Sequence, residues 1–254
     1  MERQCETVLG QYVSATRGLL DATSWYICAD THRYGGKLRR IERQIHHYGS
    51  GLNSLVALSA FRSNPDDLYL LRIGYGGMNG PLSNINAEGF AAASFHSWPE
   101  TLAWDGYSGD YGPNFLGLTL GSASYLVEDP DIGMVAYGGV VTSATADSVT
   151  LEPRDAIRKK VFIGPVAVLI EVDAGRIFEV TYQPKDEIVL VKLGQDIVSP
   201  QEESALLWIE TEGQDLDFTI TPYSARDTRG GWQIALNADP VVIKINWTRV
   251  AGFH

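Results

Sequence analysis

Residues 94–111 bring aromatic rings and carboxylates together within one short segment, SFHSWPETLAWDGYSGDY. Its aromatic and titratable side chains include Trp98, Trp104, Tyr107, Tyr111, His96, Glu100, Asp105 and Asp110. A proline, two glycines and the absence of a helical or strand period predict a loop. Because a surface loop offers large rings little to pack against, we expect these rings to contact a ligand or another domain.

Sugars fit this mixture of side chains. The C–H face of a sugar ring stacks on an aromatic ring, and its hydroxyl groups bind carboxylates. Cleavage of a glycosidic bond also needs two carboxyl groups about 5–10 Å apart. Glu100 and Asp105, five positions apart on a bent loop, are therefore the predicted acid/base pair. The predicted sugar contacts in the same loop are Trp98, Trp104, Tyr107, Tyr111, His96 and Asp110. In the alternative interpretation, the tryptophans fill a domain interface and the carboxylates cap neighbouring helices.

A second polar group occurs in RQIHHYGSGLN, within a predicted helix. If Tyr48 and Leu52 face the core, His46 and Asn53 share the opposite face. Glycine inside a helix costs about 1 kcal/mol, so the two glycines here should serve close approach by a ligand or a helix. Polysaccharide lyases use amide, imidazole and tyrosine side chains to neutralise a uronate and move its proton. We predict His46 and Asn53 as sugar contacts, with a solvated helix end as the alternative.

A third polar loop, ADTHRYGGKL, adds His32 and Arg33 as predicted sugar contacts. Asp30 and His32 lack a third metal ligand at a suitable spacing, so no metal site is predicted. The glycine-rich segment GGMNGPLSNINAEG contains no lysine of a phosphate loop, which argues against nucleotide binding. No nucleophile elbow or cysteine signature is present either. We therefore predict no cofactor.

Composition excludes several classes of partner. The 254-residue chain is 44% hydrophobic, as expected for a packed globular protein, but it has no apolar run long enough to span a membrane. A net charge of −11 makes nucleic acid an unsuitable partner. Cys5 and Cys28 are too sparse for a disulfide framework and could form one bridge or remain buried thiols. Residues 1–25 show no signal peptide.

The first 130 residues have a helical pattern. Apolar stripes predict helices at residues 3–20 and 41–61, the second with Leu55 and Ser59 on its buried stripe. A third helix is predicted to begin with Asn64 as its cap and to stop at the glycine pair 76–77, and a fourth to cover residues 113–127. The loops between them are too long for a closed bundle, which indicates part of a larger layer of helical hairpins.

After Pro130 the pattern changes to short runs rich in Val, Ile, Thr and aromatic residues. Gly, Pro, Asp and Asn separate about ten such runs, which predicts an antiparallel β-sandwich. The boundary falls near residues 128–133, so the predicted domains are 1–130 and 131–254. Trp208, Trp232 and Trp247 alternate with aliphatic residues and are predicted to lie in the core.

Two long strings in this chain resemble a family of uncharacterised, secreted microbial proteins of much greater length. They are SWYICADTHRYGGKLRRIERQIHHYGSGLNSLVALSAF and PDDLYLLRIGYGGMNGPLSNINAEGFAAASFHSWPETLAWDGYSGDYGPNFLGL, and the resemblance covers about residues 20–190. That family is grouped with six-hairpin glycosidase-like enzymes. The resemblance implies an α/α toroid followed by a β-sandwich, an extracellular location, and a chain that is the C-terminal part of a longer protein. It supplies no catalytic residues.

The expected fold is therefore α+β, with a partial α/α toroid in residues 1–130 and an antiparallel β-sandwich in residues 131–254. The expected function is that of a carbohydrate-active protein, glycoside hydrolase-like, which acts on a polysaccharide or oligosaccharide. The missing N-terminal part of a longer toroid protein is the other expected partner. Three alternatives remain: a polysaccharide lyase of the toroid type, a glycan-binding module without catalysis, and a purely structural piece.

Overall fold

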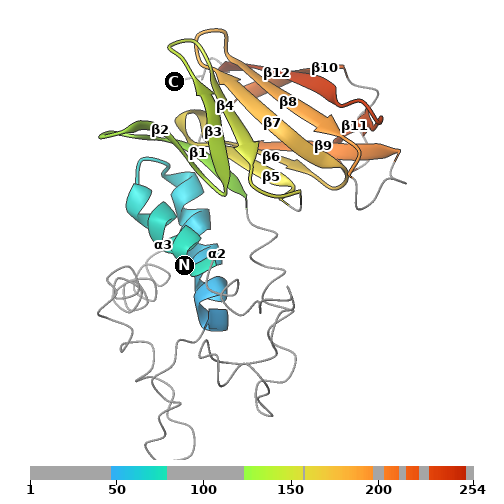
Figure 1. Ribbon diagram of the computed structural model, residues 1–254. Coiled ribbons are helices and arrows are strands. Elements are labelled where there is room, and N and C mark those ends of the chain that lie inside the picture. Colours follow the sequence, from blue (N-terminus) through green and yellow to red (C-terminus); the bar gives the residue numbers. More distant parts are fainter. Residues whose placement is uncertain are drawn as a thin grey trace, which may run out of the picture. The chain divides into compact units, whose positions relative to one another are not determined.

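The computed structural model of the protein describes residues 47–78, 123–156, 158–196, 203–211, 216–222 and 229–249 (Figure 1). The chain divides into two compact units, Met1–Leu120 and Gly121–His254. The described part of the first unit is a helical hairpin, and that of the second unit is built from β-strands.

The helical hairpin consists of α2 (His47–Ser63) and α3 (Leu68–Met78). The backbone N–H of Asn64 donates to the carbonyl oxygens of Ala60 and Phe61, which closes the end of α2. Asp67 caps α3, because its Oδ1 accepts from the N–H of Leu70 at 3.3 Å. The predicted cap at Asn64 is therefore wrong, and α3 also continues through the glycine pair 76–77 to Met78.

Close approach of the two helices decides which face of α2 is buried. A Cβ atom on Gly74 would lie 2.7 Å from Cγ of Leu58, so only glycine lets α3 approach α2 at this point. Leu58 and Phe61 are buried, whereas Leu55 is 43% exposed and Ser59 is exposed. The predicted buried stripe through Leu55 and Ser59 is therefore wrong, and the buried face is rotated around the helix.

The predicted partial α/α toroid is wrong. In the part of the chain that the structure describes, the helices form one hairpin, and most residues lie in β-strands. The predicted helix at 113–127 also fails at its C-terminal end, because Ser124–Asp129 forms strand β1. Leu126 faces the core, and Tyr125 and Val127 on the opposite face are buried too. A strand buried on both faces has no alternating pattern, so periodicity does not distinguish it from a buried helix.

The described part of the second unit forms two six-stranded sheets. The first sheet has the order β11-β9-β6-β5-β1-β2, and the second has the order β10-β12-β8-β7-β4-β3 (Figure 1). The strands are β1 (Ser124–Asp129), β2 (Gly133–Tyr137), β3 (Gly139–Ala144), β4 (Val149–Pro153), β5 (Lys160–Ile163), β6 (Val168–Val172), β7 (Arg176–Gln183), β8 (Ile188–Gly194), β9 (Ser204–Thr211), β10 (Leu216–Thr221), β11 (Trp232–Ala235) and β12 (Val241–Arg249). A short 3-10 helix, η4 (Gly164–Val166), connects β5 to β6.

Each of the ten runs that the sequence predicts as strands contains one strand of the structure. The strands β1 and β3 were missed as separate strands. The purely antiparallel prediction also needs correction, since β1 pairs with β5 in parallel. Tyr125 and Phe162 are partners in this register, and their ring centroids lie 5.9 Å apart.

One apolar layer joins the two sheets. Alternate residues of each strand point into it, for example Val189, Val191 and Leu193 of β8, which are fully buried. At one end of the layer, Trp247 stacks on Tyr182 with 6.1 Å between ring centroids and an interplanar angle of 18°. Trp232 is buried in the same layer, so the predicted core positions of Trp232 and Trp247 are confirmed.

The turn between β6 and β7 is fixed by an ion pair and a glycine. Lys159 Nζ donates to the carbonyl oxygen of Gly175 and lies 3.4 Å from Oδ2 of the buried Asp196. Gly175 has φ +72°, and a Cβ atom there would lie 2.6 Å from the backbone oxygen of Gly194. Because Gly194 pairs with Arg176 across β7 and β8, that oxygen has little room to move.

We expect Gly175→Ala to destabilise the protein by clearly more than the roughly 1–2 kcal/mol that a left-handed backbone costs a residue with a Cβ. The excess arises from the contact with the Gly194 oxygen. Gly230→Ala is the matched control, because Gly230 has φ +83° but nothing within 4 Å of its Cβ position. Urea unfolding of both variants measures the difference, and equal losses would contradict this account.

Burial raises the pKa of the Tyr182 phenol above its usual value of 10.0, and the charge of Glu128 raises it further. The folded state thus keeps this phenol neutral at a pH where the unfolded chain ionises it. This contribution to stability is complete below pH 10.0 and is lost as the pH rises through the folded-state pKa. We expect Tyr182→Phe to flatten the alkaline fall in unfolding free energy. Tyr69→Phe, at an exposed position of α3, is the control; parallel alkaline curves for wild type and Tyr182→Phe would refute the prediction.

Candidate functional site

The side chains that the sequence predicts for catalysis and sugar binding lie outside the described residues. Asn53 belongs to α2, but its side chain is not among those described. The structure therefore does not test the grouping of Glu100, Asp105, Trp98, Trp104, Tyr107, Asp110, Tyr111, His96, His46, Asn53, His32 and Arg33, and these positions stay predictions.

Within the described residues, the strongest candidate site is the outer face of the first sheet around Trp208. Ala205 and Leu207 of β9 point into the apolar layer, so strand alternation places Trp208 on the opposite face. Trp208 is partly exposed there, unlike the buried Trp232 and Trp247. The predicted core position of Trp208 is therefore wrong.

The strand register sets the neighbours of the indole. Trp208 is the cross-strand partner of Glu171 on β6, and Glu171 is the partner of Lys160 on β5. Lys160 Nζ lies 3.0 Å from Glu171 Oε1, and both side chains are about one-third exposed. Gly231 also borders the Trp208 indole. A Cβ atom on Gly231 would lie 2.9 Å from the indole Nε1, so only glycine at this position leaves room for the ring.

An arginine and a second carboxylate complete the surroundings of the ring. The Cζ atom of Arg229 lies 5.9 Å from the ring centroid of Trp208, and the indole N–H donates to the Arg229 carbonyl oxygen at 3.4 Å. Asp173 Oδ1 accepts from the N–H of Leu206 at 2.7 Å, while its Oδ2 lies 4.0 Å from Nη1 of Arg229. We call Glu171, Asp173, Trp208 and Arg229 the Trp208 cluster.

The Trp208 cluster is suited to binding rather than to proton transfer. Glu171 and Asp173 are each paired with a cation, Lys160 and Arg229 respectively, so both carboxylates already serve as hydrogen-bond or ion-pair acceptors. The cluster does offer an aromatic surface beside carboxylate acceptors and guanidinium donors, which together can contact the C–H face and hydroxyl groups of a sugar.

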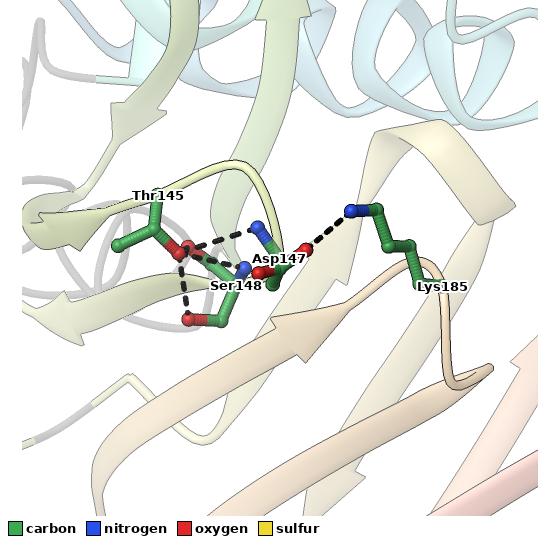
Figure 2. Close-up of polar contacts among 4 residues, drawn as sticks. All are labelled: Thr145, Asp147, Ser148 and Lys185. Carbon is green, nitrogen blue, oxygen red and sulfur yellow. Dashed lines mark hydrogen bonds and ion pairs between the residues drawn. The ribbon is translucent and has the colours of Figure 1, made fainter.

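A second polar group joins two hairpin tips, as Figure 2 shows. Thr145 Oγ1 accepts from the N–H groups of Asp147 and Ser148 at 3.3 and 3.0 Å, which closes the β3–β4 turn. Lys185 of the β7–β8 turn pairs with Asp147, but the two side chains are 67% and 73% exposed. Exposed pairs of this kind contribute about 0–1 kcal/mol, so the group is a turn-stabilising contact rather than a site.

The described residues contain no group of three or more His, Cys, Asp or Glu side chains that could hold a metal ion. None of the helices in that part of the chain has the length and apolar content needed to cross a membrane.

The sequence did contain a signal for Trp208. In the strand sequence SALLWIET, side chains alternate between the two faces of the sheet. If Ala205 and Leu207 point into the core, Trp208 points outward, on the same face as Leu206. The signal was obscured because Leu206, on the same outer face, is also apolar and is 6% exposed. Arg229 and Asp173 have no comparable signal, since their approach depends on strand order in the folded sheet.

Comparison with known proteins gives one family match. Neither the curated proteins nor the solved structures yield a match. A family model described as a family of unknown function (DUF5695) matches residues 30–243, which is well over half of the 254-residue chain. The chain therefore belongs to this family of unknown function, DUF5695.

Proposed function

We propose that the protein is carbohydrate-active and that the Trp208 cluster contacts a sugar. The observation that carries this proposal is a partly exposed indole on a regular sheet, with one carboxylate on the neighbouring strand β6, a second in the turn that follows it, and an arginine at its ring. Core packing does not account for the outward position of this ring, because the inward positions of β9 are filled by Ala205 and Leu207.

The backbone holds the cluster in place. Trp208 and Glu171 are fixed by the pairing of β9 with β6, and Asp173 is anchored by the N–H of Leu206. Rigid positioning lowers the entropy lost on binding. Because the Trp208 cluster offers one aromatic ring, we expect weak binding of a single sugar unit, with a dissociation constant of about 1 mM. A polysaccharide would bind more tightly through repeated contacts.

A second proposed function is cleavage of that carbohydrate in the manner of a glycoside hydrolase. It is favoured by the composition of residues 94–111, in which Glu100 and Asp105 would act as acid and base beside the stacking rings. An extracellular location is proposed with it, because the two strings quoted above resemble secreted microbial proteins. Product analysis would separate hydrolysis, which yields a reducing end, from elimination, which yields an unsaturated uronate.

We expect Trp208→Ala to weaken glycan binding about tenfold, which corresponds to the loss of one stacking contact of about 1.4 kcal/mol. A glycan array identifies the ligand, and isothermal titration then measures the affinity. Val242→Ala, at a position 51% exposed on the second sheet, is the matched control and should bind like the wild type. Circular dichroism checks the fold of each variant. Unchanged affinity in a folded Trp208→Ala protein would remove the Trp208 cluster from the proposal.

We expect Asp105→Asn to abolish turnover of a cleaved glycan while leaving its binding nearly intact, because the amide keeps the shape of the carboxylate but cannot exchange a proton. Reducing-end assays measure the turnover, and titration measures the binding. Asp217→Asn, at an exposed position of β10, is the control with the same chemical change. Full turnover by Asp105→Asn would exclude this residue from the mechanism without affecting the binding proposal.

A further inference from the structure

The middle of the second sheet carries an excess of basic residues, although the protein as a whole is acidic. Strands β12, β8 and β7 are successive neighbours in that sheet (Figure 1). Their charged residues are Arg176, Glu179, Lys192, Lys244 and Arg249. The whole chain has 20 basic and 31 acidic residues, and the flanking strands β4 and β10 each carry one acidic residue and no basic one. A local excess of positive charge attracts anions even when the net charge is negative.

Three of the basic side chains lie on the outer face of the sheet. Val191 points into the apolar layer, so the adjacent Lys192 points outward. Lys192 and its cross-strand partner Glu179 have side chains that are 40% and 45% exposed, and their charged groups lie 3.7 Å apart. Lys244 is also exposed. This part of the outer face is therefore accessible to a ligand.

A β-bulge brings Arg176 and Phe178 together on the same face. The register of β7 with β8 shifts just after the buried Ile177, where Phe178 is the extra residue. Cζ of Arg176 lies 4.9 Å from the ring centroid of Phe178. The ring also lies close to β8, since a Cβ atom on Gly194 would be 3.1 Å from its Cε2. Phe178 thus holds the guanidinium in place.

The guanidinium of Arg176 is positioned but not neutralised. In the part of the chain that the structure describes, no carboxylate forms an ion pair with it. Its Nε atom is buried and has no hydrogen-bond acceptor. Stacking on Phe178 engages the face of the guanidinium, whereas its N–H donors lie along the edge. A carboxylate matches that edge with two parallel hydrogen bonds, so a bound carboxylate would supply the acceptor that Arg176 lacks.

The three outward cations form one diagonal line across the sheet. Arg176 lies opposite Gly194 of β8, and Lys244 lies opposite Leu190 of the same strand. Lys192 stands midway between these two positions of β8. Each step along the line crosses one strand and two residues, which is about 7–8 Å. We call Arg176, Lys192 and Lys244 the cation row.

We propose that the cation row binds the carboxylates of an acidic polysaccharide, a polyuronate. A straight row of cations fits a linear chain with repeated negative charge, and the fork of Arg176 fits a carboxylate. That the anion belongs to a polysaccharide rests on the proposed function. A nucleic acid is less suitable, because its denser phosphate charge would be repelled more strongly by a protein with a net charge of −11.

Polygalacturonate and its fully methyl-esterified form are matched probes, because they share sugars and linkages but only the first carries carboxylates. Isothermal titration of the full chain measures binding of each. We expect the wild type to bind polygalacturonate about tenfold more tightly than the ester, and Arg176→Gln to lose this difference. Lys185→Gln is the matched control, because it also removes one positive charge, at the opposite end of β7, and should bind like the wild type. Circular dichroism checks the fold of each variant.

Glu179→Gln tests the cation row in the opposite direction. It removes the carboxylate that pairs with Lys192, at a position exposed enough to leave the core intact. We expect about threefold tighter binding of polygalacturonate, which is what one exposed ion pair is worth. Asp147→Asn, which removes the carboxylate of the exposed pair with Lys185, is the control and should leave the affinity unchanged.

The outcomes separate this proposal from the proposed function. Equal affinity of the wild type for both probes would overturn the cation row and leave the sugar contact at Trp208 standing, whereas no binding of either probe would contradict both. A folded Arg176→Gln protein that still prefers polygalacturonate, or Glu179→Gln binding no more tightly than the wild type, would also overturn the cation row. A single-stranded oligonucleotide that binds as tightly as polygalacturonate would exclude the polyuronate as its specific ligand.

Discussion

The apolar layer between the two sheets is the constraint on which the rest of the sandwich depends. Val191 of β8 and Ile243 of β12 are fully buried partners in the second sheet, and Val161 and Ile170 are fully buried partners in the first. Because side chains alternate along a strand, each inward residue fixes its neighbours outward. Any residue left for recognition must therefore stand on an outer face, at an edge, or in a turn.

The outer faces of the two sheets carry different kinds of cross-strand pairs. On the second sheet, Thr150 and Thr181 are cross-strand partners, and their hydroxyl groups lie 2.9 Å apart, so they satisfy each other. On the first sheet, the pair Glu171 and Trp208 instead combines a charge with an aromatic ring. A ring of this size in a partly exposed position gains less from burial than it would inside, so its place suggests contact with something outside the fold.

Strand positions could be predicted from the sequence because most strands combine β-branched residues with clear boundaries of Gly, Pro, Asp or Asn. Strand β1 was mistaken for helix because both of its faces are buried, and the helix α3 was started too early because Asp67, rather than Asn64, accepts the capping hydrogen bond. The toroid failed for a different reason: helical periodicity identifies single helices, but not how many hairpins surround an axis. The Trp208 cluster was missed because the partnership of its ring with Arg229 exists only in three dimensions.

The alternation of side chains along a strand also restricts which strands can pair with it. At β2, Met134 and Ala136 face inward and Val135 and Tyr137 face outward, so a partner strand in the antiparallel register must present the same order on each face. A shift of one residue would set inward side chains against outward ones. The pairing of β2 with β1 meets this condition over all five residues of β2, which places Leu126 beside Ala136 on the inner face. The Trp208 cluster lies near the other end of the same sheet, where β9 and β6 pair in the same inward and outward order.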